Sequence, residues 1–163
     1  MHQRSRSDRP WMHMTVFVDY AYGFHAVPAM AAASDLVAEG VIISNSYVPD
    51  SPAGPTTDYV FDVSNVIANH KGDAIPRQIS LHEHGGPQLP DNIEVKNALE
   101  YHDGDHVIVF LRQVSPGRYT SIAGPQSAFN VENGLVSAHH PDQQVTNFTG
   151  PMPLDDFIEL VGQ

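Results

Sequence analysis

The chain has 163 residues, of which 41 % are hydrophobic and 17 % are charged. This composition excludes the disordered class, which combines low hydrophobicity with high charge, and it suits one domain with its own core. The 19 acidic and 8 basic residues give a formal net charge of -11, which repels phosphate backbones and anionic lipid surfaces. We therefore expect neither a nucleic-acid partner nor binding to a membrane surface.

The chain contains no cysteine, so disulfides, thiolate zinc sites and cysteine nucleophiles are excluded. No stretch reaches the roughly 18 apolar residues of a membrane span. Asp19 and His25 interrupt the apolar segment that a secretory signal needs, and the compartment stays open between cytoplasmic and secreted. We expect residues 1–13 to be a flexible extension, with a tag or leader as the alternative, and residues 14–163 to form a single domain.

The first half of the chain predicts strands around one short helix. Residues 15–20 are rich in β-branched and aromatic side chains and predict a first strand. Pro28 suits the first turn of a helix, which we expect to end near Gly40, where glycine can take the left-handed cap. Residues 41–43 then favour a strand. In residues 57–63, alternation of apolar and polar side chains predicts a strand with one buried face.

The second half carries the strongest signals for antiparallel sheet. Residues 107–111 are an unbroken apolar run, as expected of a strand that is covered on both faces. Residues 115–117 and the pair Asn133-Gly134 each separate two strand-like segments and predict two hairpins. At the end, apolar residues with helical spacing over 154–161 predict an amphipathic helix. The pattern predicts a mostly β fold: a small antiparallel barrel, a short helix before its first long strand and a C-terminal helix.

The order of these segments resembles an uncharacterised bacterial family whose five-stranded barrel is akin to the OB-fold and to netrin-like or tissue-inhibitor-of-metalloproteinase-like domains. The resemblance covers about residues 27–161, and its matching stretches are Ser34–Val41, Tyr59–Val63 with Val66-Ile67, Gly72-Asp73, Asp105–Leu111, Gly117–Tyr119, Gly124–Gln126 before Phe129, and Leu154–Ile158. These are turn and core positions and carry no chemistry. The tissue inhibitors act through a disulfide-held N-terminal cysteine, so their activity does not transfer to a chain without cysteine.

Ten histidines give the one hint of a metal site. In the sequence His82-Glu83-His84 two imidazoles occupy alternate positions of a strand, so they share one face, as in barrels that bind a divalent transition metal. His102 and His106 are the candidates for further ligands, with His139 and His140 as others. Cupin barrels use a similar His-x-His strand, but the glutamate that follows it there is missing here.

The alternative is that these histidines are solvated surface residues at a strand end and in turns. No nucleophile elbow, phosphate loop, dinucleotide fingerprint or His-Glu-x-x-His helix occurs in the sequence. We therefore expect a non-enzymatic binding or structural module that needs no cofactor and takes a protein or small ligand, with self-association along a sheet edge as one form of partnership. The competing hypothesis is a metal-dependent, cupin-like enzyme that uses His82 and His84.

Overall fold

The computed structural model describes residues 13–17, 24–140, 148 and 150–163. The helices and strands in these ranges are β1 (Met14–Phe17), α1 (Val27–Ala33), β2 (Leu36–Val48), β3 (Thr56–Asn69), β4 (Gln78–His84), β5 (Ile93–Lys96), β6 (His106–Ser115), β7 (Arg118–Ser121), a 3-10 turn (Gly124–Ser127), β8 (Ala128–Glu132), β9 (Leu135–Ala138), β10 (Met152–Pro153) and α2 (Leu154–Val161). None of the described helices is long and apolar enough to cross a membrane.

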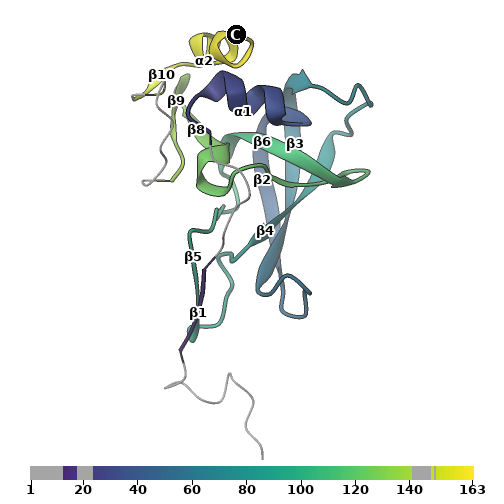
Figure 1. Ribbon diagram of the computed structural model, residues 1–163, viewed down its shortest axis with the longest axis vertical. Coiled ribbons are helices and arrows are strands. Elements are labelled where there is room, and N and C mark those ends of the chain that lie inside the picture. Colours follow the sequence, from purple (N-terminus) through teal and green to yellow (C-terminus); the bar gives the residue numbers. More distant parts are fainter. Residues whose placement is uncertain (1–12, 18–23, 141–147, 149) are drawn as a thin grey trace, which may run out of the picture.

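Five strands close into a barrel. The hydrogen-bonded order is β2, β3, β4, β7 and β6, and β6 returns to pair with β2. All of these pairs are antiparallel except β4 with β7, which run parallel over a short stretch. The predicted closed β-barrel, with a short helix before its first long strand and a helix at its C-terminus, is confirmed (Figure 1).

The barrel interior is filled by one face of each strand. Tyr59 and Phe61 on β3 point inward and are fully buried, so the alternation predicted for residues 57–63 is confirmed. The interior cluster consists of Leu36, Ala38, Ile42, Tyr59, Phe61, Ile79, Leu81, Leu99, Tyr101, Val107, Val109, Leu111, Tyr119 and Ala128. Leu99 and Tyr101 belong to the segment between β5 and β6, which therefore contributes side chains to this core.

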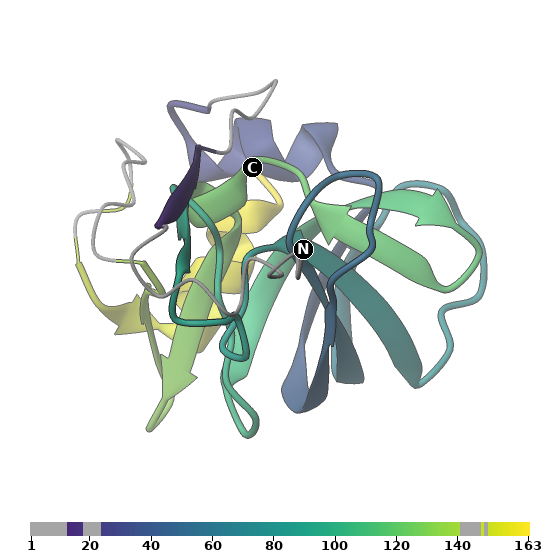
Figure 2. The same ribbon diagram turned by 90° about the horizontal axis from the view of Figure 1, so that it is seen from below.

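A second core lies outside the barrel, against β2 and β6. Ile108 and Phe110 of β6 face it, while the neighbouring Val107 and Val109 face the barrel interior, so β6 is buried on both faces as predicted. Helices α1 and α2 contact each other and cover this core together with the β8–β9 hairpin. Figure 2 shows that hairpin, in light green, beside the ring of barrel strands.

Both predicted hairpins are confirmed. Strands β6 and β7 pair around the turn at residues 115–117, and β8 pairs with β9 around Asn133-Gly134. Asn133 and Gly134 have φ angles of 52° and 76°, the left-handed conformation that a two-residue type I′ turn requires. The predicted C-terminal helix is α2, which buries Phe157 and Val161.

The predicted end of the first helix is wrong. Helix α1 ends at Ala33, and residues 36–48 form the long strand β2, so Gly40 lies within a strand. The reason is that β2 is buried on both faces: Ala38 points into the barrel and Val37 into the second core. A strand covered on both faces has no alternation of apolar and polar residues, and its apolar run cannot be told from a helix by periodicity.

A parallel ribbon of β1 and β5 extends the molecule beyond the barrel (Figure 1). The predicted first strand, residues 15–20, corresponds to β1 at residues 14–17, and residues 18–20 lie outside the described residues. Strand β5 was not expected from the sequence. Of the predicted extension, residues 1–12 lie outside the described residues, while the imidazole of His13 contacts Glu94 of β5 at 3.1 Å.

Candidate functional site

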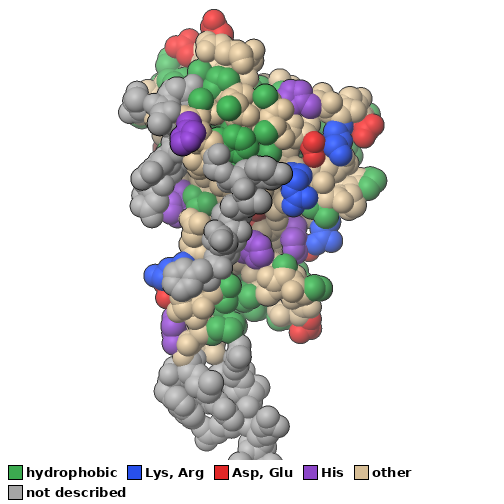
Figure 3. Space-filling view, in the orientation of Figure 1, with side chains coloured by type: hydrophobic (Ala, Val, Ile, Leu, Met, Phe, Trp, Pro, Cys, Tyr) green, Lys and Arg blue, Asp and Glu red, His purple; other side chains and the backbone are tan. Residues whose placement is uncertain are grey.

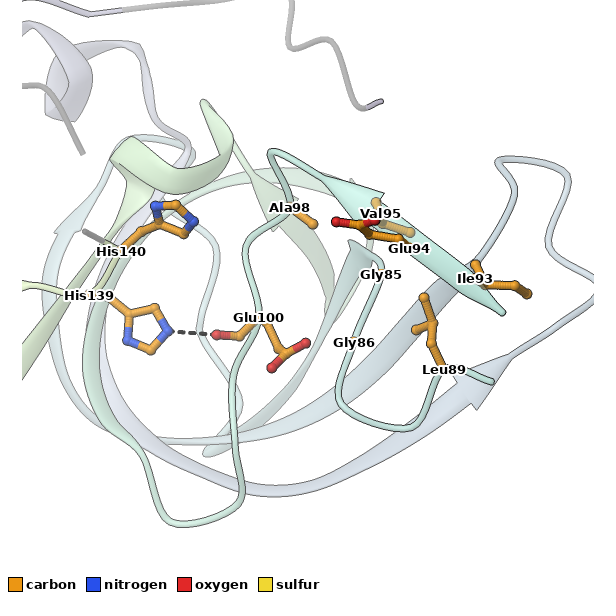
Figure 4. Close-up of a pocket in the computed structure, with 10 residues that line it drawn as sticks. All are labelled: Gly85, Gly86, Leu89, Ile93, Glu94, Val95, Ala98, Glu100, His139 and His140. Atoms are coloured by element: carbon orange, nitrogen blue, oxygen red, sulfur yellow. Dashed lines mark hydrogen bonds between the residues drawn. The ribbon is translucent and has the colours of Figure 1, made fainter. Parts of the chain in front are cut away.

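A cavity of about 430 Å³ lies where the segment that follows β4 faces the end of β9. Its lining residues are Gly85, Gly86, Leu89, Ile93, Glu94, Val95, Ala98, Glu100, His139 and His140. Figure 4 shows the two histidines on one side, the segment from Leu89 to Val95 on the other and Glu100 between them. This volume is within the range of small-molecule pockets, about 300–1,000 Å³.

The wall of this cavity next to the barrel is a two-glycine turn. Gly85 and Gly86 have φ angles of 75° and 130°, which favour glycine. A β-carbon on Gly86 would also lie 1.8 Å from the Thr57 hydroxyl oxygen. That hydroxyl donates a hydrogen bond of 2.6 Å to the Gly85 carbonyl, and the Gly85 N–H donates to the Pro55 carbonyl at 2.8 Å. The turn is therefore held by β3 and by the loop before it.

Strand β5 supplies the opposite wall and one carboxylate. The Glu94 carboxylate pairs with the Lys96 ammonium at 2.5 Å and with the His13 imidazole at 3.1 Å. Both hydrogen bonds lower the pKa of Glu94, and the one from Lys96 has the larger effect. Glu94 therefore carries its negative charge at neutral pH.

His139 is held rigidly at the other side of the cavity. Its Nδ1 lies 2.6 Å from the Asn130 side-chain oxygen, and its Nε2 lies 2.6 Å from the Glu100 carbonyl oxygen. The imidazole also packs against the ring of Tyr101, with 5.2 Å between the ring centroids. Oxygen atoms of β8 and of the segment before β6 therefore lie against both nitrogens and fix the orientation of the ring.

Glu100 brings the second carboxylate to the cavity. Its side chain is 45 % exposed, and its Oε2 lies 3.1 Å from Nε2 of His102. No lysine or arginine is among the described residues that line the cavity. Two carboxylates beside apolar side chains such as Leu89 and Ile93 make this a negatively charged, partly apolar site.

The two histidines of the predicted metal motif do share one face of a strand. On β4, Leu81 and Glu83 point into the barrel, whereas His82 and His84 point outward. Nδ1 of His82 contacts the Asp58 carboxylate at 2.5 Å and the Arg118 guanidinium at 3.0 Å. Burial lowers the pKa of His84, and the charge of the nearby His82 lowers it further. A metal cation would have to approach this pair beside the positive charge of Arg118.

The other two predicted ligands have separate partners. His102 pairs with Glu100, and Nε2 of His106 lies 2.7 Å from the Glu39 carboxylate across β6 and β2. Among the described residues there is no group of three or more histidine, aspartate and glutamate side chains arranged to hold a metal ion. The structure thus brings His82 close to His84 but joins neither His102 nor His106 to them in such a group.

Sequence reasoning missed the residue between the two motif histidines. Glu83 is fully buried, and burial raises its pKa to about 7, although hydrogen bonds from Ser121 oppose this shift. The backbone N–H of Ser121 donates to Glu83 at 2.8 Å, and the Ser121 hydroxyl lies 2.6 Å from the same carboxyl group. The signal was available, because a residue between two outward positions of a strand must face inward.

In comparisons with known proteins, no family model matches the chain, and no curated protein matches it either.

Proposed function

We propose that the chain is a non-enzymatic binding module that takes a small organic cation, such as an amine with an apolar substituent, in the cavity between residues 85–100 and His139. The observation that supports this proposal is the composition of the cavity walls. The carboxylates of Glu94 and Glu100 line it, no lysine or arginine among the described residues does, and the rest of the wall is largely apolar or glycine.

An ammonium group fits the charges of the site. The Glu100 carboxylate is half-exposed, so a bound ammonium group can reach it without a large desolvation penalty. Glu94 already shares its charge with Lys96, whereas Glu100 lies against the imidazole of His102 and has less positive charge around it. The apolar side chains of Leu89 and Val95 then suit the substituent of the amine.

Binding without catalysis agrees with how the polar groups are held. The ring of His139 is held in place by Asn130 and the Glu100 carbonyl, and the lowered pKa of Glu94 makes its carboxylate a poor proton donor. These groups are arranged to orient a charged ligand.

The test is isothermal titration calorimetry of the full chain with benzylammonium, and with benzyl alcohol as the uncharged probe of the same shape. Benzylammonium should bind at least about tenfold more tightly than the alcohol, since about 1.4 kcal/mol of charge interaction corresponds to a factor of ten. Glu100→Gln should remove most of that difference. Glu132→Gln, at an exposed glutamate of β8, is the matched control and should leave the affinity unchanged.

A second variant tests the location of the site. Ala98→Leu places a larger side chain in the cavity and should abolish binding while the protein stays folded. If the alcohol binds as tightly as the amine, the ligand class is wrong. If Ala98→Leu binds the amine as the parent protein does, the ligand does not occupy this cavity.

A further inference from the structure

The outer surface of the barrel carries a second cluster of charged side chains, on strands β4, β7 and β6. His82 faces outward from β4, and Arg118 and Thr120 alternate on β7 with the buried Tyr119 and Ser121. Arg112 of β6 stands opposite Thr120 in the antiparallel pairing of β6 with β7. Figure 3 shows histidine side chains, in purple, next to lysine or arginine side chains, in blue, on this side of the molecule.

The two arginines of this surface stand on neighbouring strands. Arg118 and Thr120 are two residues apart on one strand, which separates their α-carbons by about 7 Å. Arg112 is directly opposite Thr120, and side chains at such paired positions are about 5 Å apart at their β-carbons. Arg112 and Arg118 therefore occupy neighbouring positions of one face, and the Arg118 guanidinium reaches across β4 toward Asp58 of β3.

Arg118 is poorly satisfied by its neighbours. Nδ1 of His82 lies between the Asp58 carboxylate, which can only accept, and the Arg118 guanidinium, which can only donate. Nδ1 can satisfy only one of these two partners at a time, and at 2.5 Å the carboxylate contact is the shorter. What remains for Arg118 is an ion pair of 3.6 Å with Asp58, and its Nε is shielded from solvent without a hydrogen-bond partner among the described residues.

Among the described residues, Arg112 has no ion pair within 4.0 Å, unlike the other lysine and arginine side chains. Carboxylates lie within 4.0 Å of the cationic groups of Lys71, Arg77 and Lys96. The exposed side chain of Arg112 makes no hydrogen bond or ion pair with the described residues. Its positive charge does act on the buried Glu83 carboxyl, whose pKa it lowers slightly against the larger effect of burial. Arg112, without an ion pair to the described residues, and Arg118 thus place two positive charges on one face of a chain that has 19 acidic residues.

We propose that this face, made of His82, Arg112 and Arg118, binds an oxyanion, the phosphate or carboxylate group of a ligand. Guanidinium groups bind such oxygens with paired hydrogen bonds, and two of them on adjacent strands can approach one anion from two sides. Asp58 and His82 have a positioning role: the Asp58 carboxylate holds the imidazole, and the imidazole lies against the Arg118 guanidinium. This site is distinct from the amine cavity, whose lining residues include none of these side chains.

The experiment is an NMR titration of amide chemical shifts in the full chain, with inorganic phosphate and, separately, with acetate, while sodium chloride keeps the ionic strength constant. We expect saturable shifts of amides on β4, β6 and β7. Arg118→Gln and Arg112→Gln should each weaken binding at least about fivefold, the loss of roughly 1 kcal/mol. The matched control is Arg77→Gln, at an exposed arginine paired with Asp62 just before β4, and it should bind as the parent protein does.

Three outcomes would overturn the proposal: shifts that do not saturate, equal weakening in Arg77→Gln, or no weakening in either Arg112→Gln or Arg118→Gln. Stronger binding of phosphate than of acetate would assign the site to phosphorylated ligands, and the reverse order to carboxylates. Glu100→Gln, which tests the amine cavity, should leave the anion titration unchanged, so the two proposals fail or succeed independently.

Discussion

The carboxyl group of Glu83 on β4 accepts the backbone N–H of Ser121 on β7 at 2.8 Å, two residues beyond the last backbone pair of the parallel ladder that closes the barrel. That ladder is short, with Ser80 opposite Arg118 and Leu81 opposite Tyr119. Where the backbone pairing ends, the Glu83 side chain takes the place of a backbone acceptor. One buried acidic group therefore adds a side-chain hydrogen bond to the seam of the barrel.

This arrangement makes the stability of the barrel depend on pH. Burial raises the pKa of Glu83 from 4.5 to about 7, so the folded state holds this proton more tightly than the unfolded state does. The contribution of Glu83 is therefore most favourable below about pH 4.5 and is lost as the pH rises to 7. Over this window the loss amounts to about 3 kcal/mol. We expect Glu83→Gln, which keeps the shape and cannot ionise, to remove this part of the pH dependence.

Urea unfolding of the two proteins at a series of pH values measures the effect. The free energy of unfolding of Glu83→Gln minus that of the parent should rise between pH 4.5 and 7 and then level off. Glu132→Gln, at an exposed glutamate, should give a flat difference over the same range. A flat difference for Glu83→Gln as well would contradict the raised pKa.

Two adjacent threonines on β3 allow a test of the hydrogen bond that holds the two-glycine turn. The Thr57 hydroxyl donates to the Gly85 carbonyl at 2.6 Å, whereas the buried Thr56 hydroxyl has no hydrogen-bond partner among the described residues. Thr57→Val leaves that carbonyl without its donor and should cost about 1–3 kcal/mol. Thr56→Val removes an unsatisfied polar atom and should be neutral or stabilising. Thermal unfolding measures the stability of both variants, and an equal loss of stability in the two would show that the Thr57 hydrogen bond does not stabilise the fold.

Gly40 allows β2 and β3 to approach each other closely. A β-carbon at this position would lie 2.1 Å from the Asp62 carbonyl oxygen and 2.9 Å from the ring of Phe61. Gly40→Ala should therefore destabilise the barrel by at least about 1–3 kcal/mol, the usual effect of overpacking. Gly162→Ala, after α2, is the control, because its nearest contact would be an ordinary 3.6 Å. Chemical denaturation compares them, and a similar stability of both variants would argue against the tight contact at Gly40.

The sequence predicted best those elements whose signal is local. The Asn133-Gly134 turn needs two left-handed residues, and α2 shows its buried stripe within two turns, so both were found. The first part of β2, residues 36–40, has the pattern of a helix end because it is buried on both sides, whereas residues 41–43 of the same strand are predicted correctly. Strand β5 was missed because its partner, β1, lies nearly 80 residues away and pairs with it in parallel, a contact that leaves no turn signal in the sequence.

For the candidate sites, alternation along one strand was predictable and contacts between strands were not. The spacing of His82 and His84 fixed their common face. It could not show that Arg118 would lie against His82, since that contact depends on how β4 and β7 pair. In the same way, His139 and Glu100 meet only because the end of β9 lies near the segment between β5 and β6.

The second core depends on Phe157 of α2. Its ring centroid lies 4.8 Å from that of Phe129 on β8, 5.9 Å from that of Phe148 and 6.3 Å from that of Phe110 on β6, and its side chain is fully buried. Phe157→Ala should lower the free energy of unfolding by about 3–5 kcal/mol, because it removes buried surface and leaves a cavity among aromatic rings. Glu159→Ala, on the exposed side of the same helix, keeps helix propensity comparable and should change stability little. Urea unfolding measures both variants, and a loss below about 1 kcal/mol in Phe157→Ala would mean that α2 contributes little to this core.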